Sequence, residues 1–186
     1  MVSGEPGNIV ILLTFKVTLT KEFLMKPAFT TPDLCDIAPE TPSCTTQFRQ
    51  FGRKTHFSGR VRTVKCEEDN VLLRQMLHTP GKGEVLVVDG NASLACAVMG
   101  DMIAEAGANH GWEGVIIYGA IRDSSAINEM DFGVKALGTN PRKSRKEGKG
   151  ETDVPVTFGG VTFHPGDYLY SDADGILVSK TPLVSE

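Results

Sequence analysis

Hydrophobic residues along the chain fall into short runs that alternate between strand-like and helix-like spacing. Residues 84–89 and 115–118 are short apolar runs rich in β-branched side chains, which is typical of strands buried on both faces. Residues 69–78 carry apolar side chains at helical spacing, and a second helix is expected over residues 102–109, after a break at Gly100. This order of strands and helices predicts a parallel sheet whose strands are joined by right-handed crossovers.

Shorter elements are expected on both sides of this parallel core. Thr31 can cap the start of a helix, because Pro32 then occupies the first helical position. Further helical segments are expected between Asn91 and Met99 and near residues 124–130. Strands separated in part by Gly-Gly, Pro-Gly and Asp-Gly turns are predicted at residues 47–51, 59–66, 134–137, 154–158, 161–163, 168–171 and 175–179. The predicted fold class is therefore α/β, with a parallel strand–helix core and antiparallel strands in the C-terminal part.

Length and composition indicate one globular domain. The chain has 186 residues, of which 40% are hydrophobic and 23% charged, so it can bury one sizeable core. Residues 1–24 are poor in turn signals and precede a second methionine, Met25. We expect residues 1–24 to be an extension outside the core, although residues 10–17 could add an edge strand, and residues 25–186 to form the domain. The apolar run 9–13 is too short for a membrane span and lacks preceding basic residues, so neither an anchor nor a signal peptide is predicted.

Charge and cysteine usage argue against several other classes of protein. The formal net charge of −4 gives no broad attraction for phosphates, so direct binding of nucleic acid is not expected. The basic cluster 142–146, with Lys149 nearby, is followed by glycines and has no interleaved aromatic residue, which favours a solvated loop. The four cysteines form no CxxC pair and no secretory signal precedes them, so we expect reduced thiols and a cytoplasmic location.

Two points in the parallel core could support chemistry, because ligands gather where strands end and helices begin. At residues 100–103 the glycine break restarts a helix, whose first backbone N–H groups could bind a carboxylate or phosphate. Arg122 and Asp123 follow the strand 115–118 after a Gly-Ala turn. Arg122 could bind a carboxylate with two hydrogen bonds, and Asp123 could be an oxygen ligand for Mg²⁺ or Mn²⁺. The residues alone leave a second interpretation open, in which Asp101 is a plain helix cap and Arg122 and Asp123 form a surface ion pair.

No other motif indicates a specific chemistry. Neither a GxGxxG sequence nor a Walker pattern occurs, which disfavours binding of a dinucleotide, ATP or adenosylmethionine. The four histidines lack HxxxH and HExxH spacing, and neither a Gly-x-Ser-x-Gly elbow nor an obvious Schiff-base lysine is present. Residues 172–175 resemble a small calcium loop but lack the rest of its acidic ligands, so a tight Asp-Gly turn is expected there.

Asp101, twenty intervening residues and then Arg122 and Asp123 form a D-x20-R-D pattern. This pattern resembles that of the ribonuclease-E-regulator-like (RraA-like) class II aldolases, and the resemblance extends over roughly residues 30–182. Its further segments are residues 31–36, 47–52, 68–70, 85–90, 111–114, 138–144 and 172–178. The resemblance favours the functional interpretation of the three residues over the plain cap and ion pair.

This resemblance implies a fold, an assembly and a reaction. The fold is a single β/β/α swivelling-type domain, and the assembly is a homotrimer or a dimer of trimers. The reaction is the divalent-metal-dependent cleavage of 4-hydroxy-4-methyl-2-oxoglutarate to two pyruvates, with oxaloacetate decarboxylation as a secondary activity. Asp101 and Arg122 are then the catalytic residues, and Asp123 binds Mg²⁺ or Mn²⁺. The residues implied to bind the small α-keto acid substrate are Gly100, Asp101, Met102, Ile103 and Arg122.

The same resemblance offers an alternative function without catalysis. Founding relatives of the family bind ribonuclease E and inhibit it, so the chain could be a protein-binding regulator of that enzyme. The intact D-x20-R-D pattern favours an aldolase, because a pure binding module gains nothing obvious from keeping Asp123 beside Arg122. A third interpretation, a methyltransferase of menaquinone synthesis, is disfavoured because the glycine-rich cofactor loop is missing.

Overall fold

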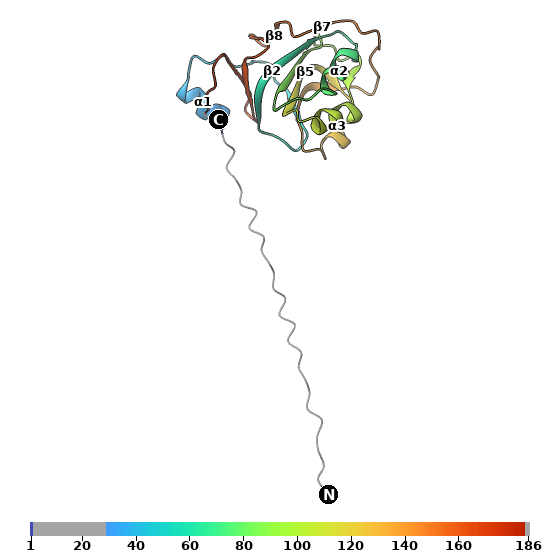
Figure 1. The fold of residues 1–186 in the computed structure, drawn as a ribbon, viewed down its shortest axis with the longest axis horizontal. Coiled ribbons are helices and arrows are strands. Elements are labelled where there is room, and N and C mark those ends of the chain that lie inside the picture. The colour runs from blue at the N-terminus through green and yellow to red at the C-terminus, as the bar shows by residue number, and fades with distance from the viewer. Residues whose placement is uncertain (2–28, 185–186) are drawn as a thin grey trace.

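A curled sheet of nine strands forms the centre of the protein in the computed structural model, which describes Met1 and residues 29–184 (Figure 1). Residues 2–24 of the expected extension, with the possible edge strand at residues 10–17, lie outside the described residues. Four parallel strands run through the middle of the sheet in the order β6, β5, β3 and β2. Their bounds are β2 (Phe57–Lys65), β3 (Val85–Asp89), β5 (Gly114–Ile121) and β6 (Gly133–Thr139).

The register of these four strands confirms the predicted parallel core. Val64 of β2 pairs with Val88 of β3, and Val88 in turn pairs with Ile117 of β5. The carboxyl ends of the strands therefore lie at one edge of the sheet. The two apolar runs predicted from the sequence are buried because layers of structure cover both faces of the sheet.

Shorter strands extend this sheet or pack beside it. They are β1 (Arg49–Phe51), β4 (Ala97–Met99), β7 (Glu151–Thr152), β8 (Val156–Phe158), β9 (Val161–Phe163), β10 (Tyr168–Ser171) and β11 (Ile176–Ser179). β1 pairs with β6, β7 and β10 pair with β2, and β11 pairs with β10, all antiparallel. β4 runs parallel to β5, whereas β8 and β9 form a separate hairpin. The predicted antiparallel C-terminal strands are confirmed, with shifted ends.

Alternate side chains of the central strands face two different hydrophobic cores. Val88 faces the core under the helices α2 (Val71–Leu77), α3 (Asp101–Asn109) and α4 (Ser124–Ile127). Val87 faces a second core, which the β8–β9 hairpin and strands β10 and β11 cover. Figure 1 shows α2 and α3 together on one face of the sheet. The protein thus has a β layer, a central sheet and a helical layer, which is the expected β/β/α arrangement.

The expected helix between Asn91 and Met99 is wrong. Asn91 and Ala92 adopt left-handed conformations with φ of 54° and 55°, and the chain then enters strand β4. Ala97 pairs with Ala120 of β5, so sheet pairing overrides the helix propensity of the alanines in this segment.

The expected cap of the first helix is also wrong by one residue. The N-cap of α1 (Thr31–Ile37) is Thr30, whose side chain accepts a hydrogen bond from the backbone N–H of Asp33 at 3.2 Å. Thr31 instead donates from its backbone N and its Oγ1 to the Asp172 carboxylate, at 2.6 and 2.7 Å. Asp172 therefore fixes α1 to the turn between β10 and β11, where the predicted Asp-Gly turn is confirmed.

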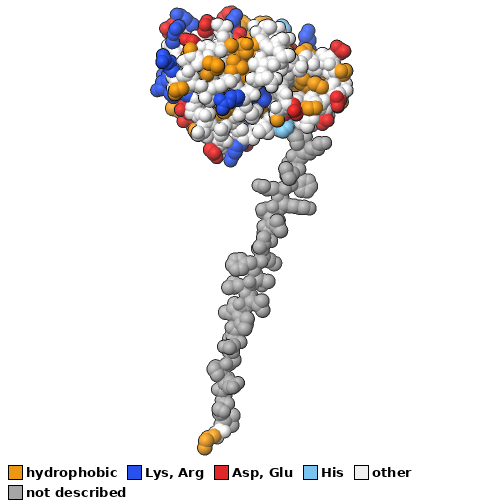
Figure 2. Space-filling model, turned by 180° about the vertical axis from the view of Figure 1, so that it is seen from behind, with side chains coloured by type: hydrophobic (Ala, Val, Ile, Leu, Met, Phe, Trp, Pro, Cys, Tyr) orange, Lys and Arg blue, Asp and Glu red, His pale blue; other side chains and the backbone are white. Residues whose placement is uncertain are grey.

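The described helices, the surface and the cysteines bear on three further expectations. None of the helices in the described part of the chain is long and apolar enough to cross a bilayer. Figure 2 shows lysine and arginine side chains gathered at one upper edge, while exposed hydrophobic side chains form small separate patches. All four cysteines are free thiols, as expected.

Candidate active site

Strands β4 and β5 bring the two predicted functional segments together at the carboxyl edge of the sheet. β4 ends at Met99 and leads into α3, while β5 ends at Ile121 and leads into Arg122. The backbone N–H of Arg122 donates to the carbonyl oxygen of Met99 at 2.9 Å. The twenty residues between Asp101 and Arg122 therefore form a helix and a strand that return the chain to its starting edge.

Gly100 lies against the side chains of Arg122 and Asp123. A Cβ atom on Gly100 would lie 2.6 Å from Oδ2 of Asp123 and 3.1 Å from Nε of Arg122. The first distance is too short for a real carbon–oxygen contact, so glycine is what allows the two side chains to approach the backbone here. The glycine break at the start of α3 thus also provides the space in which Arg122 and Asp123 meet.

Arg122 and Asp123 form an ion pair in which Nε and Oδ2 are 3.3 Å apart. Their side chains are 30% and 36% exposed, so both remain accessible to a ligand. Asp123 adopts the left-handed backbone conformation, with φ of 56° and ψ of 35°, and its side chain does not cap α4. Non-glycine residues seldom adopt this conformation, and here it accompanies a carboxylate that faces Arg122 and Gly100.

Asp101 is the first residue of α3, and the cap before it is Gly100. The Oδ1 atom of Asp101 accepts a hydrogen bond from the backbone N–H of Met102 at 2.8 Å. Ile103 is buried in the helical core and fixes this helix start, whereas the Met102 side chain is 77% exposed. Asp101 is therefore not a plain N-cap, and its half-buried carboxylate stands at the beginning of the helix, where backbone N–H groups lack intrahelical acceptors.

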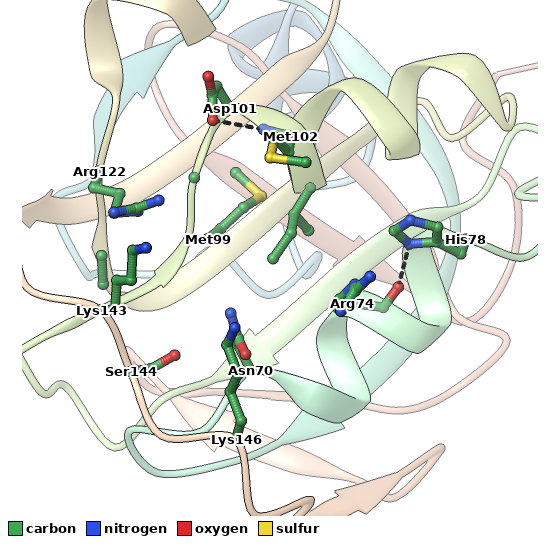
Figure 3. A pocket seen from close by; sticks show the side chains of 13 residues that line it. Asn70, Arg74, His78, Met99, Asp101, Met102, Arg122, Lys143, Ser144 and Lys146 are labelled. Carbon is green, nitrogen blue, oxygen red and sulfur yellow. Dashed lines mark hydrogen bonds between the residues drawn. The ribbon is translucent and has the colours of Figure 1, made fainter.

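Asp101 and Arg122 line a cavity of about 260 Å³ (Figure 3). Gly100, Met102 and Ile103 also line it, so all of the predicted substrate-binding residues border one space. In Figure 3 the Arg122 side chain points into this cavity from the end of β5. The rest of the wall includes residues that the sequence did not single out, namely Asn70, Arg74, His78, Lys143, Ser144 and Lys146.

Comparison with known proteins shows the family of this chain. The RraA-like family model, described as Aldolase/RraA, matches residues 31–178. The chain belongs to the RraA-like family. Two relatives from Pseudomonas syringae pv. tomato and Azotobacter vinelandii, provisionally named as 4-hydroxy-4-methyl-2-oxoglutarate aldolases, are 50% and 53% identical to it. Each of these comparisons covers 83% of this chain and 96% of the relative.

Solved structures of related proteins share the RraA-like fold. A Geobacillus kaustophilus protein described as an S-adenosylmethionine:2-dimethylmenaquinone methyltransferase is 48% identical, with a TM-score of 0.83 over 85% of this chain and 99% of that one. The RNA-processing inhibitor RraA from Thermus thermophilus is 44% identical, with a TM-score of 0.81 over 83% of this chain and 94% of that one. Because the relatives carry different functional names, the activity of this chain has to be argued from its site.

In this RraA-like chain, the basic segment 142–146 forms part of the cavity wall. The backbone N–H of Ala97 donates to the carbonyl of Arg142 at 2.8 Å, and the N–H of Ser144 donates to the carbonyl of Ala97 at 3.2 Å. These bonds fix the segment to the start of β4, and Ser144 is buried. The segment is a loop whose basic side chains are exposed, as expected, but its backbone is held against β4. The signal that could have revealed its role is its position after β6, at the same carboxyl edge as Arg122.

Positive charge predominates around the RraA-like cavity. Its lining includes four cationic side chains, which are Arg74, Arg122, Lys143 and Lys146. The one carboxylate among the lining residues is that of Asp101. Within residues 29–184, Arg74, Lys143 and Lys146 form no ion pair, and the buried Oγ of Ser144 has no hydrogen-bond partner. The cavity therefore suits a small ligand with more than one negative charge.

Asp123 is the residue that fits a divalent cation. Within the part of the chain that the structure describes, no group of three or more His, Cys, Asp and Glu side chains could hold a metal ion. Mg²⁺, however, usually keeps several waters and binds through one or two carboxylates together with oxygens of the substrate. The exposed Asp123 carboxylate makes no capping bond to α4 and borders the space that Gly100 leaves open, so it fits such a partly hydrated ion.

Proposed function

We propose that this RraA-like protein is a class II aldolase that cleaves 4-hydroxy-4-methyl-2-oxoglutarate to two pyruvates and requires a divalent metal. Oxaloacetate decarboxylation is its secondary activity, because both reactions form the same pyruvate enolate. The observation that carries the proposal is the meeting of Gly100, Arg122 and Asp123 beside a cavity that Asp101 also lines. The provisional names of relatives at about 50% identity support the same reaction.

The difficult step is the same in both reactions. Breaking the carbon–carbon bond leaves its electron pair on the pyruvate fragment, and the negative charge develops on the former keto oxygen. A bound Mg²⁺ or Mn²⁺ supplies Lewis-acid stabilisation of that oxygen. Asp123 holds the metal, and the rest of the work falls to the side chains and backbone around the cavity.

Arg122 binds the substrate and stabilises the charge that develops during cleavage. Its guanidinium is restricted by the ion pair with Asp123 and points into the cavity. The planar group offers parallel N–H donors, which match the oxygens of a carboxylate or an enolate. Because this charge is in place before the reaction begins, it stabilises the transition state without costly reorganisation.

The start of α3 binds one carboxylate of the substrate and moves the proton. The N–H groups of Asp101 and Ile103 have no acceptor within the helix, whereas that of Met102 donates to Oδ1 of Asp101, and the helix dipole favours an anion beside them. Asp101 accepts the proton of the 4-hydroxyl group through a water as the C3–C4 bond breaks. The same carboxyl group returns a proton to C3 of the enolate, which completes the second pyruvate.

The other cationic side chains of the cavity wall bind the second carboxylate. Both 4-hydroxy-4-methyl-2-oxoglutarate and oxaloacetate carry a carboxylate at each end, so a bound substrate needs positive charge at two places. Arg74 reaches the cavity from α2, and Lys143 and Lys146 reach it from the segment after β6. A substrate held at both ends is fixed with its scissile bond between them.

We also propose that the protein forms a homotrimer or a dimer of trimers. Met102, which lines the cavity, is 77% exposed, and Leu94 is 52% exposed. A neighbouring copy would cover such exposed apolar side chains. The protein should therefore elute from a sizing column well above its monomer mass of 20.1 kDa, and a clean monomer at micromolar concentration would contradict this assembly.

Release of pyruvate is the direct test of the proposed reaction. Purified protein is incubated with oxaloacetate and with 4-hydroxy-4-methyl-2-oxoglutarate, first with Mg²⁺ and then with EDTA. We expect pyruvate from both substrates with Mg²⁺ and only the uncatalysed rate with EDTA. If the protein releases no pyruvate above that rate under any condition and binds ribonuclease E, the alternative of a regulator is favoured. The name of the Thermus relative, an RNA-processing inhibitor, supports that alternative.

A further inference from the structure

The buried carboxylate of Asp69 joins two walls of the cavity that are far apart in the sequence. Asp69 is 2% exposed and lies between β2 and α2. Its Oδ1 accepts a hydrogen bond from the backbone N–H of Val71 at 3.0 Å, at the start of α2. Its Oδ2 accepts from the backbone N–H groups of Glu147 and Gly148, at 2.6 and 3.0 Å. One side chain thus fixes the loop after β6 to the first turn of α2.

These two elements carry the cationic end of the cavity. Asn70 and Arg74 lie at the start of α2 and along it, whereas Lys143, Ser144 and Lys146 lie in the loop that Asp69 holds. Asp69 itself is not a lining residue and is not a neighbour of the Arg122 and Asp123 pair. A change at Asp69 should therefore move one end of the cavity and leave the other in place.

The Asp69 carboxylate is well suited to this task because it remains charged. Burial raises its pKa, but the hydrogen bonds from backbone N–H groups outweigh burial and bring the pKa below its usual value. Hydrogen bonds to a charged acceptor are stronger than those between neutral groups. The backbone N–H of Arg145 also donates to the carbonyl oxygen of Glu68 at 2.7 Å, which adds to the attachment of the loop. A side-chain substitution does not remove this bond.

We propose that Asp69 is a positioning residue that determines selectivity for substrates with two carboxylates, by holding Lys143, Ser144 and Lys146 over the cavity. The inference rests on the proposed aldolase function and extends it. A mispositioned loop should weaken binding of the second carboxylate, which in 4-hydroxy-4-methyl-2-oxoglutarate is present before and after the bond breaks. Loss of such uniform binding raises KM with little change in kcat.

Asp69→Asn is the variant that isolates this role. The amide has one acceptor oxygen in place of two, so it can keep the hydrogen bond from the N–H of Val71. Its NH₂ group then faces the N–H groups of Glu147 and Gly148, and because all of these are donors, both hydrogen bonds to the loop are lost. We expect KM for 4-hydroxy-4-methyl-2-oxoglutarate to rise by about tenfold to a hundredfold, the range for losing charge-assisted hydrogen bonds. Exchange of the C3 protons of pyruvate with D₂O, which involves a single carboxylate, should stay within about twofold of wild type.

Asp172→Asn is the matched control. Asp172 is also 2% exposed and accepts backbone hydrogen bonds, but it fixes α1 to the β10–β11 turn, away from the cavity lining. This variant should lose stability while keeping the wild-type KM for 4-hydroxy-4-methyl-2-oxoglutarate. Limited trypsin digestion gives a readout independent of activity, because residues 142–149 contain Arg142, Lys143, Arg145, Lys146 and Lys149. Cleavage in this loop should be about tenfold faster in Asp69→Asn and unchanged in Asp172→Asn.

The outcomes separate this inference from the proposed function. A selective rise in KM with faster loop cleavage supports the positioning role of Asp69. Wild-type KM in Asp69→Asn, or an equal loss of pyruvate exchange and 4-hydroxy-4-methyl-2-oxoglutarate cleavage, overturns it. A wild-type protein that neither exchanges pyruvate protons nor consumes oxaloacetate would instead overturn the proposed aldolase, and the digestion would still decide whether Asp69 holds the loop.

Discussion

A Cβ atom on Gly100 would lie 2.6 Å from Oδ2 of Asp123, so the start of α3 and the candidate metal ligand share one space. The two residues are separated by a helix and a strand in the sequence, and the parallel pairing of β4 with β5 brings them together. The closeness explains why a glycine, and not another helix-capping residue, precedes Asp101. It also makes Gly100 a sensitive test of the site.

Gly100→Ala should impair turnover without unfolding the protein. The backbone φ of −125° at this position is available to alanine, and the clashing atom belongs to a partly exposed side chain that can move. Displacing Asp123 and Arg122 by about 1 Å should lower kcat for oxaloacetate by about 10²-fold. Gly119→Ala is the control, because the nearest atom to its Cβ would be an ordinary 3.5 Å away. Equal activity of both variants would contradict the assigned contact.

Arg122→Lys should lower kcat/KM by at least about 10²-fold, the scale for removing one transition-state donor. Lysine retains the positive charge but loses the planar pair of donors that matches carboxylate and enolate oxygens. Affinity for Mg²⁺, measured by titration calorimetry, should change little, since Asp123 remains in place. A variant with near wild-type turnover would show that charge alone suffices at this position.

Asp101→Asn should retain metal binding and slow proton transfer. The amide oxygen can still accept the hydrogen bond from the N–H of Met102, so the helix start is preserved. Loss of a general acid–base group typically slows turnover by about 10²- to 10⁴-fold. Steady-state rates with 4-hydroxy-4-methyl-2-oxoglutarate and exchange of pyruvate protons should both fall. An unchanged exchange rate would assign the proton transfer to another group.

The carboxylate of Asp172 should make the fold sensitive to acid. Burial raises the pKa of Asp172, but the hydrogen bonds from Thr31, Asp174 and Gly175 lower it by more than burial raises it. The pKa in the folded protein is therefore below its usual value. A lowered carboxyl pKa contributes stability above the unfolded pKa of about 4, and this stability is lost as pH falls through the folded pKa. Urea unfolding should therefore show a smaller free energy of unfolding below about pH 4, with a weaker pH dependence in Asp172→Asn. Identical pH profiles would contradict this role.

The sequence predicted those parts of the site whose signals are local. The glycine break at Gly100 and the pair after the apolar run 115–118 are readable because strand ends and helix starts have their own sequence patterns. The part of the cavity wall that carries Arg74, Lys143 and Lys146 was not predicted, because it depends on contacts between distant segments. The loop with Lys143 reaches the cavity through pairing with β4, a strand in the segment where a helix was expected.

Asp69 was missed for a related reason. Nothing in the sequence around Asp69 shows that its carboxylate is buried, because two of its three hydrogen-bond partners are backbone N–H groups about eighty residues away. The same holds for Thr31, which was expected to cap α1 and instead binds Asp172 from the other end of the domain. Side chains that bridge distant segments carry no periodic signal, whereas the core strands and helices do.

The most direct test of the proposed aldolase is Mg²⁺-dependent pyruvate release from oxaloacetate by wild type, Asp123→Ala and Asp131→Ala. Asp131 is an exposed aspartate outside the cavity lining and serves as the matched control. We expect wild type and Asp131→Ala to release pyruvate at the same rate. Asp123→Ala should release none above the uncatalysed rate at any Mg²⁺ concentration. The circular dichroism spectrum of Asp123→Ala should be the same as that of wild type. Wild-type turnover by a correctly folded Asp123→Ala protein would contradict the assignment of Asp123 as the metal ligand and, with it, the proposed active site.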